Sequence, residues 1–269
     1  MIPYLVILIF VQIIFMQFRI HQDFKNLTQN LLLIIDNFKD QGNDFVIGPR
    51  NVIKEFDVEG HKVIVKSFKI PNLLNKVIYR YFRATKAKRS YDYAIKLQES
   101  AIGTPKPYGY FEKYDGIGLT QSYYISEHLL ADLTFRELVE IPDFPDHENI
   151  LRQFTCFCFQ LHEKGIEFKD HSPGNTLIKK VENGKYAFYL VDLNRMNFHD
   201  SMSFDLRMEN LKRLTPKEEM VAVMSNEYAK YYSKPEKEIF DSLWHKTSEF
   251  QRKFWRKKAI KKKLKFKKA

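Results

Sequence analysis

The sequence has 269 residues, of which 44% are hydrophobic and 29% are charged. A chain of this length and composition can bury a substantial core, in one domain of two lobes or in two small domains, which excludes a disordered or fibrous protein. The two cysteines, Cys156 and Cys158, lie two residues apart within an apolar run. This placement argues against a disulfide framework, favours a reducing compartment and suits two small buried side chains.

The excess positive charge, +11 in total, is concentrated at the carboxyl terminus. Residues 252–268 contain 11 basic and no acidic residues, so the rest of the chain carries 33 of each. Four apolar residues interrupt this basic tail: Trp255, Ile260, Leu264 and Phe266. Such a mixture can lie on an anionic bilayer, and a solvated helix end explains it equally well. No nucleic-acid-binding motif accompanies the tail, so nucleic acid is not an expected partner.

The amino-terminal residues 2–18 are almost wholly apolar, interrupted only by Gln12 and Gln17, and basic residues follow from Arg19. This length is close to the minimum for a membrane-spanning helix, whose basic flank would lie on the cytoplasmic side. A signal peptide fits poorly, because its charged region would precede the apolar one. Residues 1–40 are therefore interpreted as a membrane anchor or, alternatively, as a packed helix or an unnatural upstream start.

Three short strands are predicted next, at residues 44–48, 52–58 and 61–68, joined by glycine-containing turns. We expect these antiparallel strands to open the folded part of the chain. Strand side chains alternate between faces, so Ile64 and Lys66 are expected on the same face of the third strand.

The following segment is predicted to contain two helices and a hairpin. The first helix, residues 73–89, carries a cationic stripe, and the second covers residues 90–100. Residues 108–112 and 119–126 then flank a turn at Asp115. The stripe consists of Lys76, Arg80 and Arg83.

The remaining chain is predicted to be mainly helical. One long helix ends at Gly165, and two short strands, 176–179 and 187–191, follow it. Pro216 and Pro235 interrupt the helices beyond them. The apolar face of the long helix is formed by Ile150, Phe154, Phe157, Cys158 and Leu161.

The residues that suggest chemistry occur in a defined order: Lys66 on a strand, acids on a helix, a hairpin, a long helix and two loops. Asp170 and Asn175, spaced as Asp-x-x-x-x-Asn, are a weak signal alone. Between a helix and a hairpin whose second strand leads to Asp192, the same spacing is typical of a kinase.

Phosphoryl transfer assigns a role to each of these residues. Asp192 and Asn175 offer oxygen ligands to Mg²⁺, Asp170 orients the attacking hydroxyl and accepts its proton, and Lys66 pairs with the α- and β-phosphates of ATP. Each residue alone also has a structural explanation, as a solvated lysine, a turn former or a helix cap. Only their joint order favours catalysis.

Other residues are assigned by position. Asp92 and Glu99 are seven residues apart on one helix face, so either can pair with Lys66, and we prefer Asp92. Glu127 follows a strand where the connector between lobes would contact adenine, chiefly through backbone groups. His162 and His171 are expected to be structural, because no second ligand lies at metal-binding spacing.

These residues resemble the protein-kinase-like superfamily and, within it, the lipopolysaccharide core kinases of the Kdo/WaaP family. The resemblance covers residues 45–214 and includes segments 48–51, 63–68, 101–107, 161–166, 169–175 and 191–195. It implies an α+β fold with two lobes, a small antiparallel sheet with one or two helices at residues 41–127 and a mainly helical lobe at residues 128–250. A basic tail, residues 251–269, would follow.

The resemblance also implies an activity: an ATP- and Mg²⁺-dependent kinase that phosphorylates Kdo or heptose of the lipid A-core region, on the cytoplasmic side of the inner membrane. The expected partners are a lipid-linked or small sugar acceptor and an anionic membrane surface, which the cationic stripe and the tail would contact. We expect a monomer. The alternatives are a protein or other small-molecule kinase of the same fold, and a non-catalytic kinase-like membrane-associated module.

The sequence departs from the family pattern at three places. Phe168 stands where a histidine is usual, and Asn194 stands where glycine is usual, although asparagine tolerates the left-handed backbone that such a turn needs. A glycine-rich phosphate loop is missing, so Gly48, Arg50 and Asn51 are the candidates to replace it. Because Asp170, Asn175 and Asp192 are all retained, an active kinase is favoured over a pseudokinase.

Overall fold

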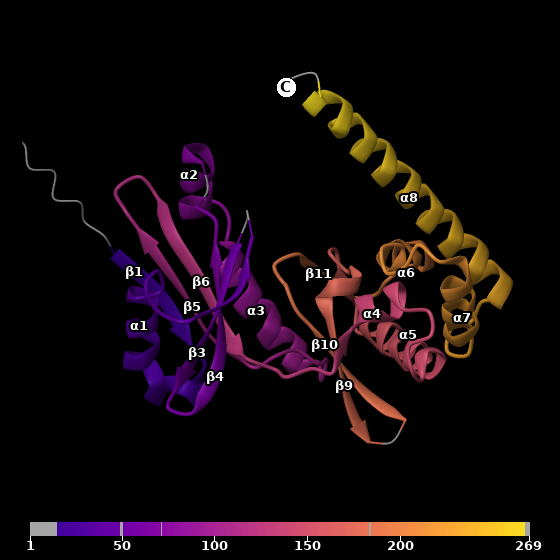
Figure 1. Cartoon of the computed structure of the whole chain (residues 1–269), viewed down its shortest axis with the longest axis horizontal. Helices are drawn as coiled ribbons and strands as arrows, with labels where there is room; N and C mark the ends of the chain where they lie inside the picture. The colour runs from indigo at the N-terminus through magenta and orange to yellow at the C-terminus, as the bar shows by residue number, and fades with distance from the viewer. Residues whose placement is uncertain (1–14, 49–50, 71, 183, 267–269) are drawn as a thin grey trace, which may run out of the picture. The chain divides into compact units, whose positions relative to one another are not determined.

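The computed structural model describes residues 15–48, 51–70, 72–182 and 184–266 (Figure 1). The chain divides into two compact units, one formed by Met1–Asp92 with Lys106–His128 and the other by Tyr93–Pro105 with Leu129–Ala269. The fold is α+β, as predicted.

A six-stranded sheet with the order β1-β5-β6-β4-β3-β2 forms the first unit, and all its neighbouring strands are antiparallel. The strands predicted as 44–48, 52–58 and 61–68 are present, as is the predicted hairpin, β5 with β6. The strands are β1 (Phe15–Ile20), β2 (Asn43–Ile47), β3 (Asn51–Val58), β4 (His61–Phe68), β5 (Pro107–Tyr114) and β6 (Leu119–Glu127).

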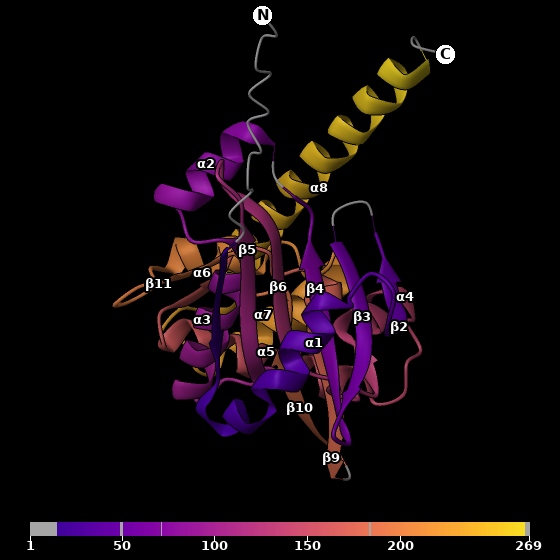
Figure 2. The ribbon, with the colours of Figure 1, turned by 90° about the vertical axis from the view of Figure 1, so that its left-hand side faces the viewer.

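One face of this sheet packs against η1 (Gln22–Leu27) and α1 (Thr28–Asp36), and Figure 2 shows α1 in front of the strands. Val63 and Val65 of β4 are fully buried in the core beneath α1. Since strand side chains alternate, Ile64 and Lys66 lie on the opposite face, where both are partly exposed. Their predicted common face is confirmed.

The expectation that the strand at residue 44 opens the fold is wrong. Residues 15–18, expected at the end of an apolar helix, belong to edge strand β1, in which Phe15 pairs with Tyr114 of β5. Phe18 stacks on Phe111 at 5.5 Å between ring centroids, so this part of the apolar run is stabilised by the sheet. Residues 1–14 of the expected anchor lie outside the described residues. Within the described ranges, no helix is both long and apolar enough to cross a membrane.

The helix boundaries between β4 and β5 also differ from the prediction. In place of helices at 73–89 and 90–100, the structure has α2 (Leu73–Tyr81) and α3 (Lys86–Glu99). The break has a local cause, because the Thr85 hydroxyl accepts a hydrogen bond from the Lys88 backbone N–H at 3.1 Å and so starts a new helix.

The second unit consists of small sheets and helices. Its strands are β7 (Leu133–Thr134), β8 (Ile166–Phe168), β9 (Thr176–Glu182), β10 (Lys185–Leu190) and β11 (Met196–Phe198). Its helices are α4 (Phe135–Glu140), α5 (His147–Glu163), η2 (Pro173–Asn175), α6 (Phe204–Leu211), α7 (Glu218–Ala229) and α8 (Glu236–Phe266).

The core of this unit is built around α5, whose predicted apolar face is buried. The helix ends just before Gly165, as predicted. This glycine has φ +67°, and a Cβ added there would lie 1.8 Å from the His199 backbone oxygen, so only glycine fits. Both cysteines are free; Cys158 is buried as expected, whereas Cys156 is only partly buried.

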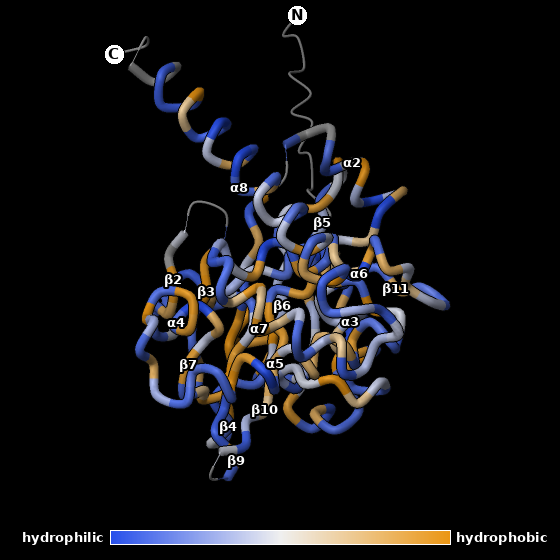
Figure 3. The backbone as a smooth tube through the Cα atoms, turned by 90° about the vertical axis from the view of Figure 1, so that its right-hand side faces the viewer, coloured by the Kyte–Doolittle hydropathy of each residue, from blue (hydrophilic) through white to orange (hydrophobic). Residues whose placement is uncertain are grey.

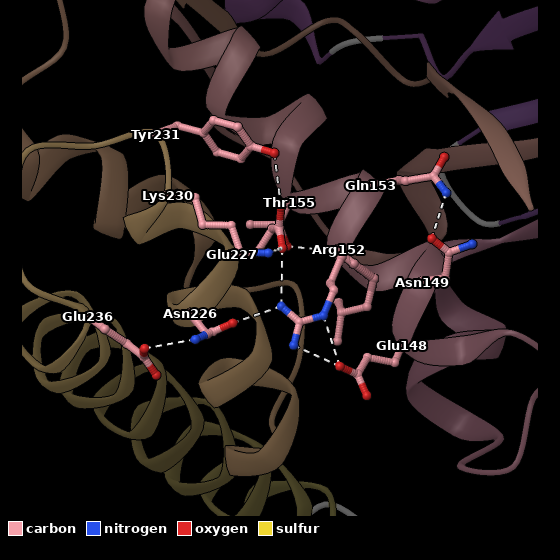
Figure 4. Close-up of polar contacts among 11 residues, drawn as sticks. Glu148, Asn149, Arg152, Gln153, Thr155, Asn226, Glu227, Lys230, Tyr231 and Glu236 are labelled. Atoms are coloured by element: carbon pink, nitrogen blue, oxygen red, sulfur yellow. Dashed lines mark hydrogen bonds and ion pairs between the residues drawn. The ribbon is translucent and has the colours of Figure 1, made fainter.

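A polar network holds α5 against α7 (Figure 4). Arg152 of α5 donates to Asn226 and Glu227 of α7, at 2.8 and 3.1 Å. Glu227 also accepts from Lys230 and from the Tyr231 hydroxyl. Burial opposes ionisation of Glu227, but these donors outweigh it and lower the pKa of the carboxyl. The network therefore stabilises the helical packing as an ionised cluster.

The basic tail, as far as residue 266, is the continuation of α8, a single helix of 31 residues. Basic residues occupy three consecutive positions twice, at 256–258 and 261–263, so they cover more than one helix face. Figure 3 shows this end as mainly hydrophilic with isolated hydrophobic positions. Over residues 251–263, the part of the tail whose side chains are described, the helix is charged and has no continuous apolar face.

Candidate active site

Lys66 lies in the middle of the first unit's sheet. It pairs with Ile53 of β3 and with Tyr124 of β6, so its backbone is fixed on both sides. Its ammonium group lies 5.5 Å from the centroid of the Phe68 ring, on the face opposite α1.

A buried carboxylate, which was not predicted, anchors the start of α3 to the same sheet. Glu112 of β5 is 2% exposed and accepts hydrogen bonds from the Thr85 hydroxyl and, at 2.7 Å, from the Tyr114 hydroxyl. Burial raises the pKa of Glu112, and both hydroxyls oppose the rise. The register places Glu112 on the same face as Lys66, so α3 is fixed on the face that carries the lysine.

The two acids proposed as partners of Lys66 have different surroundings. The Asp92 carboxylate forms an ion pair with Lys88 at 2.7 Å, one turn earlier on α3. Glu99 is exposed at the end of α3 and belongs to the second unit. The preference for Asp92 stays a prediction.

The other nucleotide-binding candidates of the first unit have local structural contacts. Glu127 ends β6, and its backbone N–H donates to the Lys106 oxygen at 2.8 Å. The Gly48 N–H donates to the Asn51 oxygen at 3.0 Å and closes the β2–β3 turn. Arg50, the third candidate of that turn, lies outside the described residues. Their phosphate and adenine contacts stay predictions.

In the second unit, the backbone brings Asp170, Asn175 and Asp192 into one region. Two pairings join the loops that carry them: Phe168 pairs with Met196 between β8 and β11, and the Val191 N–H donates to the Asn175 oxygen at 3.0 Å. The loop after β8 and the loop after β10 are therefore held side by side at both ends. Asp170, Asn175 and Asp192 therefore lie on adjacent loops of the second unit.

The orientation of Asn175 suits a cation ligand. Its side-chain nitrogen donates to the Asp170 backbone oxygen at 2.8 Å, which directs the amide oxygen to the other side. Asp192 has φ +59°, a left-handed conformation that is uncommon outside glycine, and Asn194 donates to its carboxylate at 2.6 Å. The left-handed residue is thus Asp192 and not Asn194, where we expected it; the side chain of Asn194 instead orients the carboxylate.

This donor set fits Mg²⁺. One carboxylate and one amide oxygen are hard ligands, and Mg²⁺ is commonly held by one or two carboxylates together with phosphate oxygens and water. Within the described residues, no group of three or more His, Cys, Asp or Glu side chains forms a metal cage. The residues therefore suit a cation that arrives with a phosphorylated ligand.

Two arginines that were not predicted flank Asp170. Arg213 donates to one carboxylate oxygen at 3.0 Å, and Arg195 lies 3.7 Å from the other. Arg195 is the last residue of segment 191–195, which carries part of the family resemblance, so the sequence could have indicated that it lies near the site. Arg213 is 43 residues away in sequence, so only the fold of the chain brings it to Asp170.

Phe168 and His171 complete the wall behind the loop, and both are fully buried. The His171 ring packs against Phe154 and Phe168, with centroids 5.7 and 5.4 Å away. His162 contacts the Tyr228 hydroxyl and Asn210 through its two ring nitrogens, at 2.8 and 3.2 Å. Both rings are buried within the second unit, and their structural role stays a prediction.

These histidines should make stability depend on pH. Burial lowers the pKa of His162 to about 3 and that of His171 to about 4, so between about pH 6.5 and pH 4 these protons bind mainly to the unfolded state. Their contribution to stability is complete above pH 6.5 and is lost as the pH falls towards 4. Between pH 6.5 and 5, each should contribute a loss of about 2 kcal/mol.

Urea unfolding between pH 7 and 5 measures this effect. His171→Phe should flatten the pH dependence, whereas His245→Gln, at an exposed histidine of α8, should leave it unchanged. An equal slope in His171→Phe and the unmodified chain would reject this explanation.

Comparisons with known proteins define the fold class. No family model and no curated protein matches the sequence. The solved structure of WaaP in complex with acyl carrier protein is similar to this chain, with a TM-score of 0.60 and 15% sequence identity, over 88% of this chain and 97% of that one. At this identity the likeness shows the fold alone. The chain therefore has a kinase-like two-lobe fold, as the sequence predicted.

Proposed function

We propose that this chain is an ATP- and Mg²⁺-dependent phosphotransferase that phosphorylates a sugar hydroxyl of the lipopolysaccharide lipid A-core, on Kdo or heptose. The observation that carries the proposal is the placement of Asp170, Asn175 and Asp192 on two loops held together by backbone pairing. The kinase-like fold supports the proposal, as does the likeness to WaaP.

The side chains would divide the work as follows. ATP supplies the phosphoryl group, and Mg²⁺ neutralises its charge. Asp192 and the Asn175 amide oxygen would hold the cation, and Lys66 would hold the α- and β-phosphates. Asp170 would orient the acceptor hydroxyl and take its proton.

The surroundings of Asp170 favour an anionic sugar as the acceptor. Arg195 and Arg213 present guanidinium groups beside the carboxylate, and both are partly exposed. Guanidinium groups recognise carboxylates and phosphates through paired hydrogen bonds. An acidic sugar such as Kdo, or a phosphorylated one, would supply that anion.

Transfer of labelled γ-phosphate to a panel of acceptors tests the proposal. We expect transfer to Kdo-lipid A or to heptosylated core, dependent on Mg²⁺, and none to generic protein. ATP with Mg²⁺ at about 100 times its Kd should raise the melting temperature by about 5–10 °C.

Each other outcome of the panel has a defined meaning. Transfer only to protein would replace the sugar kinase with a protein kinase. ATP-dependent stabilisation without transfer to any acceptor would reject the proposed acceptors, and neither stabilisation nor transfer would indicate a non-catalytic module.

A further inference from the structure

One end of the first unit exposes large apolar side chains that its core does not use. Tyr81 and Phe82, at the end of α2, are 65% and 82% exposed, and Ile117, in the β5–β6 turn, is 55% exposed. We call these three residues the aromatic tip. Single exposed apolar residues are ordinary, but a group of them marks an interaction surface.

The parts of the tip are held together by Arg80. Its guanidinium donates to the backbone oxygens of Asp115 and Gly116 at 2.8 and 2.9 Å, which ties α2 to the β5–β6 turn. It also lies over the rings of Phe15 and Tyr81, at 5.8 and 5.3 Å. Figure 2 shows α2 at the end of the sheet where β5 and β6 turn. The tip is thus one fixed surface.

The three residues of the predicted cationic stripe have different environments at this surface. Lys76 lies 3.8 Å from Asp115 and compensates that acid, while Arg80 lies between the rings. Arg83 is exposed directly after Phe82. Two residues of the predicted cationic stripe, Lys76 and Arg80, therefore hold the tip in place. The third, Arg83, presents its charge beside the exposed rings.

We propose that the aromatic tip docks on an anionic lipid bilayer, with Tyr81 and Phe82 in the interface and Arg83 at the headgroups. Aromatic side chains favour the membrane interface, and each basic residue near an anionic surface adds attraction. The path of the chain supports a lipid bilayer as the partner of the tip. Strand β1 starts at Phe15, beside the tip, and the sequence before it, residues 2–14, is almost wholly apolar.

Vesicle co-sedimentation of the full chain tests the proposal, with phosphatidylcholine vesicles with and without phosphatidylglycerol. The unmodified chain should bind the anionic vesicles more strongly. The double substitution Tyr81→Ser with Phe82→Ser should weaken binding about tenfold, because two side chains lose their apolar insertion. Arg83→Glu should weaken it by a similar factor on anionic vesicles alone, about tenfold.

Leu33→Ser is the matched control, because Leu33 is 61% exposed on α1 of the same unit. It should bind vesicles like the unmodified chain. Tip variants that bind as tightly as this control would overturn the proposal, and binding would then belong to the basic end of α8 or to residues 2–14. A changed oligomeric state with unchanged vesicle binding would instead identify a self-association surface. Transfer to a soluble acceptor should be unaffected, which separates this inference from the proposed activity.

Discussion

Asp170→Asn is expected to lower the rate of phosphoryl transfer by about 10²–10⁴-fold and to leave ATP binding intact. Asparagine has nearly the same shape, and its amide oxygen can still accept the hydrogen bond that Arg213 donates to Asp170 at 3.0 Å. It cannot take a proton from the acceptor hydroxyl. The substitution therefore removes the proposed chemical step and keeps the surrounding loop.

Single-turnover transfer of labelled γ-phosphate measures the rate, and the ATP-dependent shift in melting temperature measures binding. Asp143→Asn is the matched control, since Asp143 is exposed in the loop before α5 and should retain full activity. Full turnover in Asp170→Asn would show that Asp170 is not the base. A simultaneous loss of ATP-dependent stabilisation would show that Asp170 acts in binding.

The sequence predicted those parts of the fold that depend on local patterns. In β4, alternation separates Val63 and Val65, which are buried, from Ile64 and Lys66 on the other face. The long helix before Gly165 was predicted from its apolar period. In both cases the environment of a residue depends on its neighbours in the sequence. The apolar pattern of the sequence alone therefore predicts it.

Other features depend on pairing between distant segments, and the sequence did not reveal them. The apolar run that ends at Phe18 looked like a helix, because nothing local indicates that β5, some 90 residues later, pairs with it. The approach of Arg213 to Asp170 has the same origin. Glu112 could have been recognised from the sequence. It is a charged residue between Tyr110 and Tyr114 on one strand face, and a charge in such a position indicates a buried hydrogen-bond partner.

The candidate site combines features that the sequence predicted with features that it did not. These concern Asp170, Asn175 and Asp192. Their order along the chain indicated a kinase loop, and the β9–β10 hairpin between them was predicted correctly. The left-handed conformation was expected at Asn194 because that position is glycine in the family. The structure places it two residues earlier, at Asp192, whose carboxylate accepts a hydrogen bond from the Asn194 side chain.

That geometry makes Asp192 the residue whose substitution should have the clearest effect on metal dependence. Asp192→Asn is preferable to Asp192→Ala, because asparagine tolerates φ near +59° whereas alanine would add backbone strain of about 1 kcal/mol. Asparagine keeps the shape and removes the charge that would hold Mg²⁺. Of the shift of about 5–10 °C that ATP with Mg²⁺ should produce, we expect the Mg²⁺-dependent part to disappear.

Melting temperatures recorded with ATP across a Mg²⁺ titration measure this effect. Asn194→Ala retains the Asp192 carboxylate and loses only its 2.6 Å hydrogen bond, so it should need more Mg²⁺ for the same shift. Asp200→Ala, at an exposed aspartate after β11, should behave like the unmodified chain. If Asp192→Asn keeps the full Mg²⁺-dependent shift, the cation is held elsewhere, and Asp192 is not its ligand. A graded response, largest for Asp192→Asn, smaller for Asn194→Ala and absent for Asp200→Ala, is the pattern that a metal ligand and its orienting neighbour require.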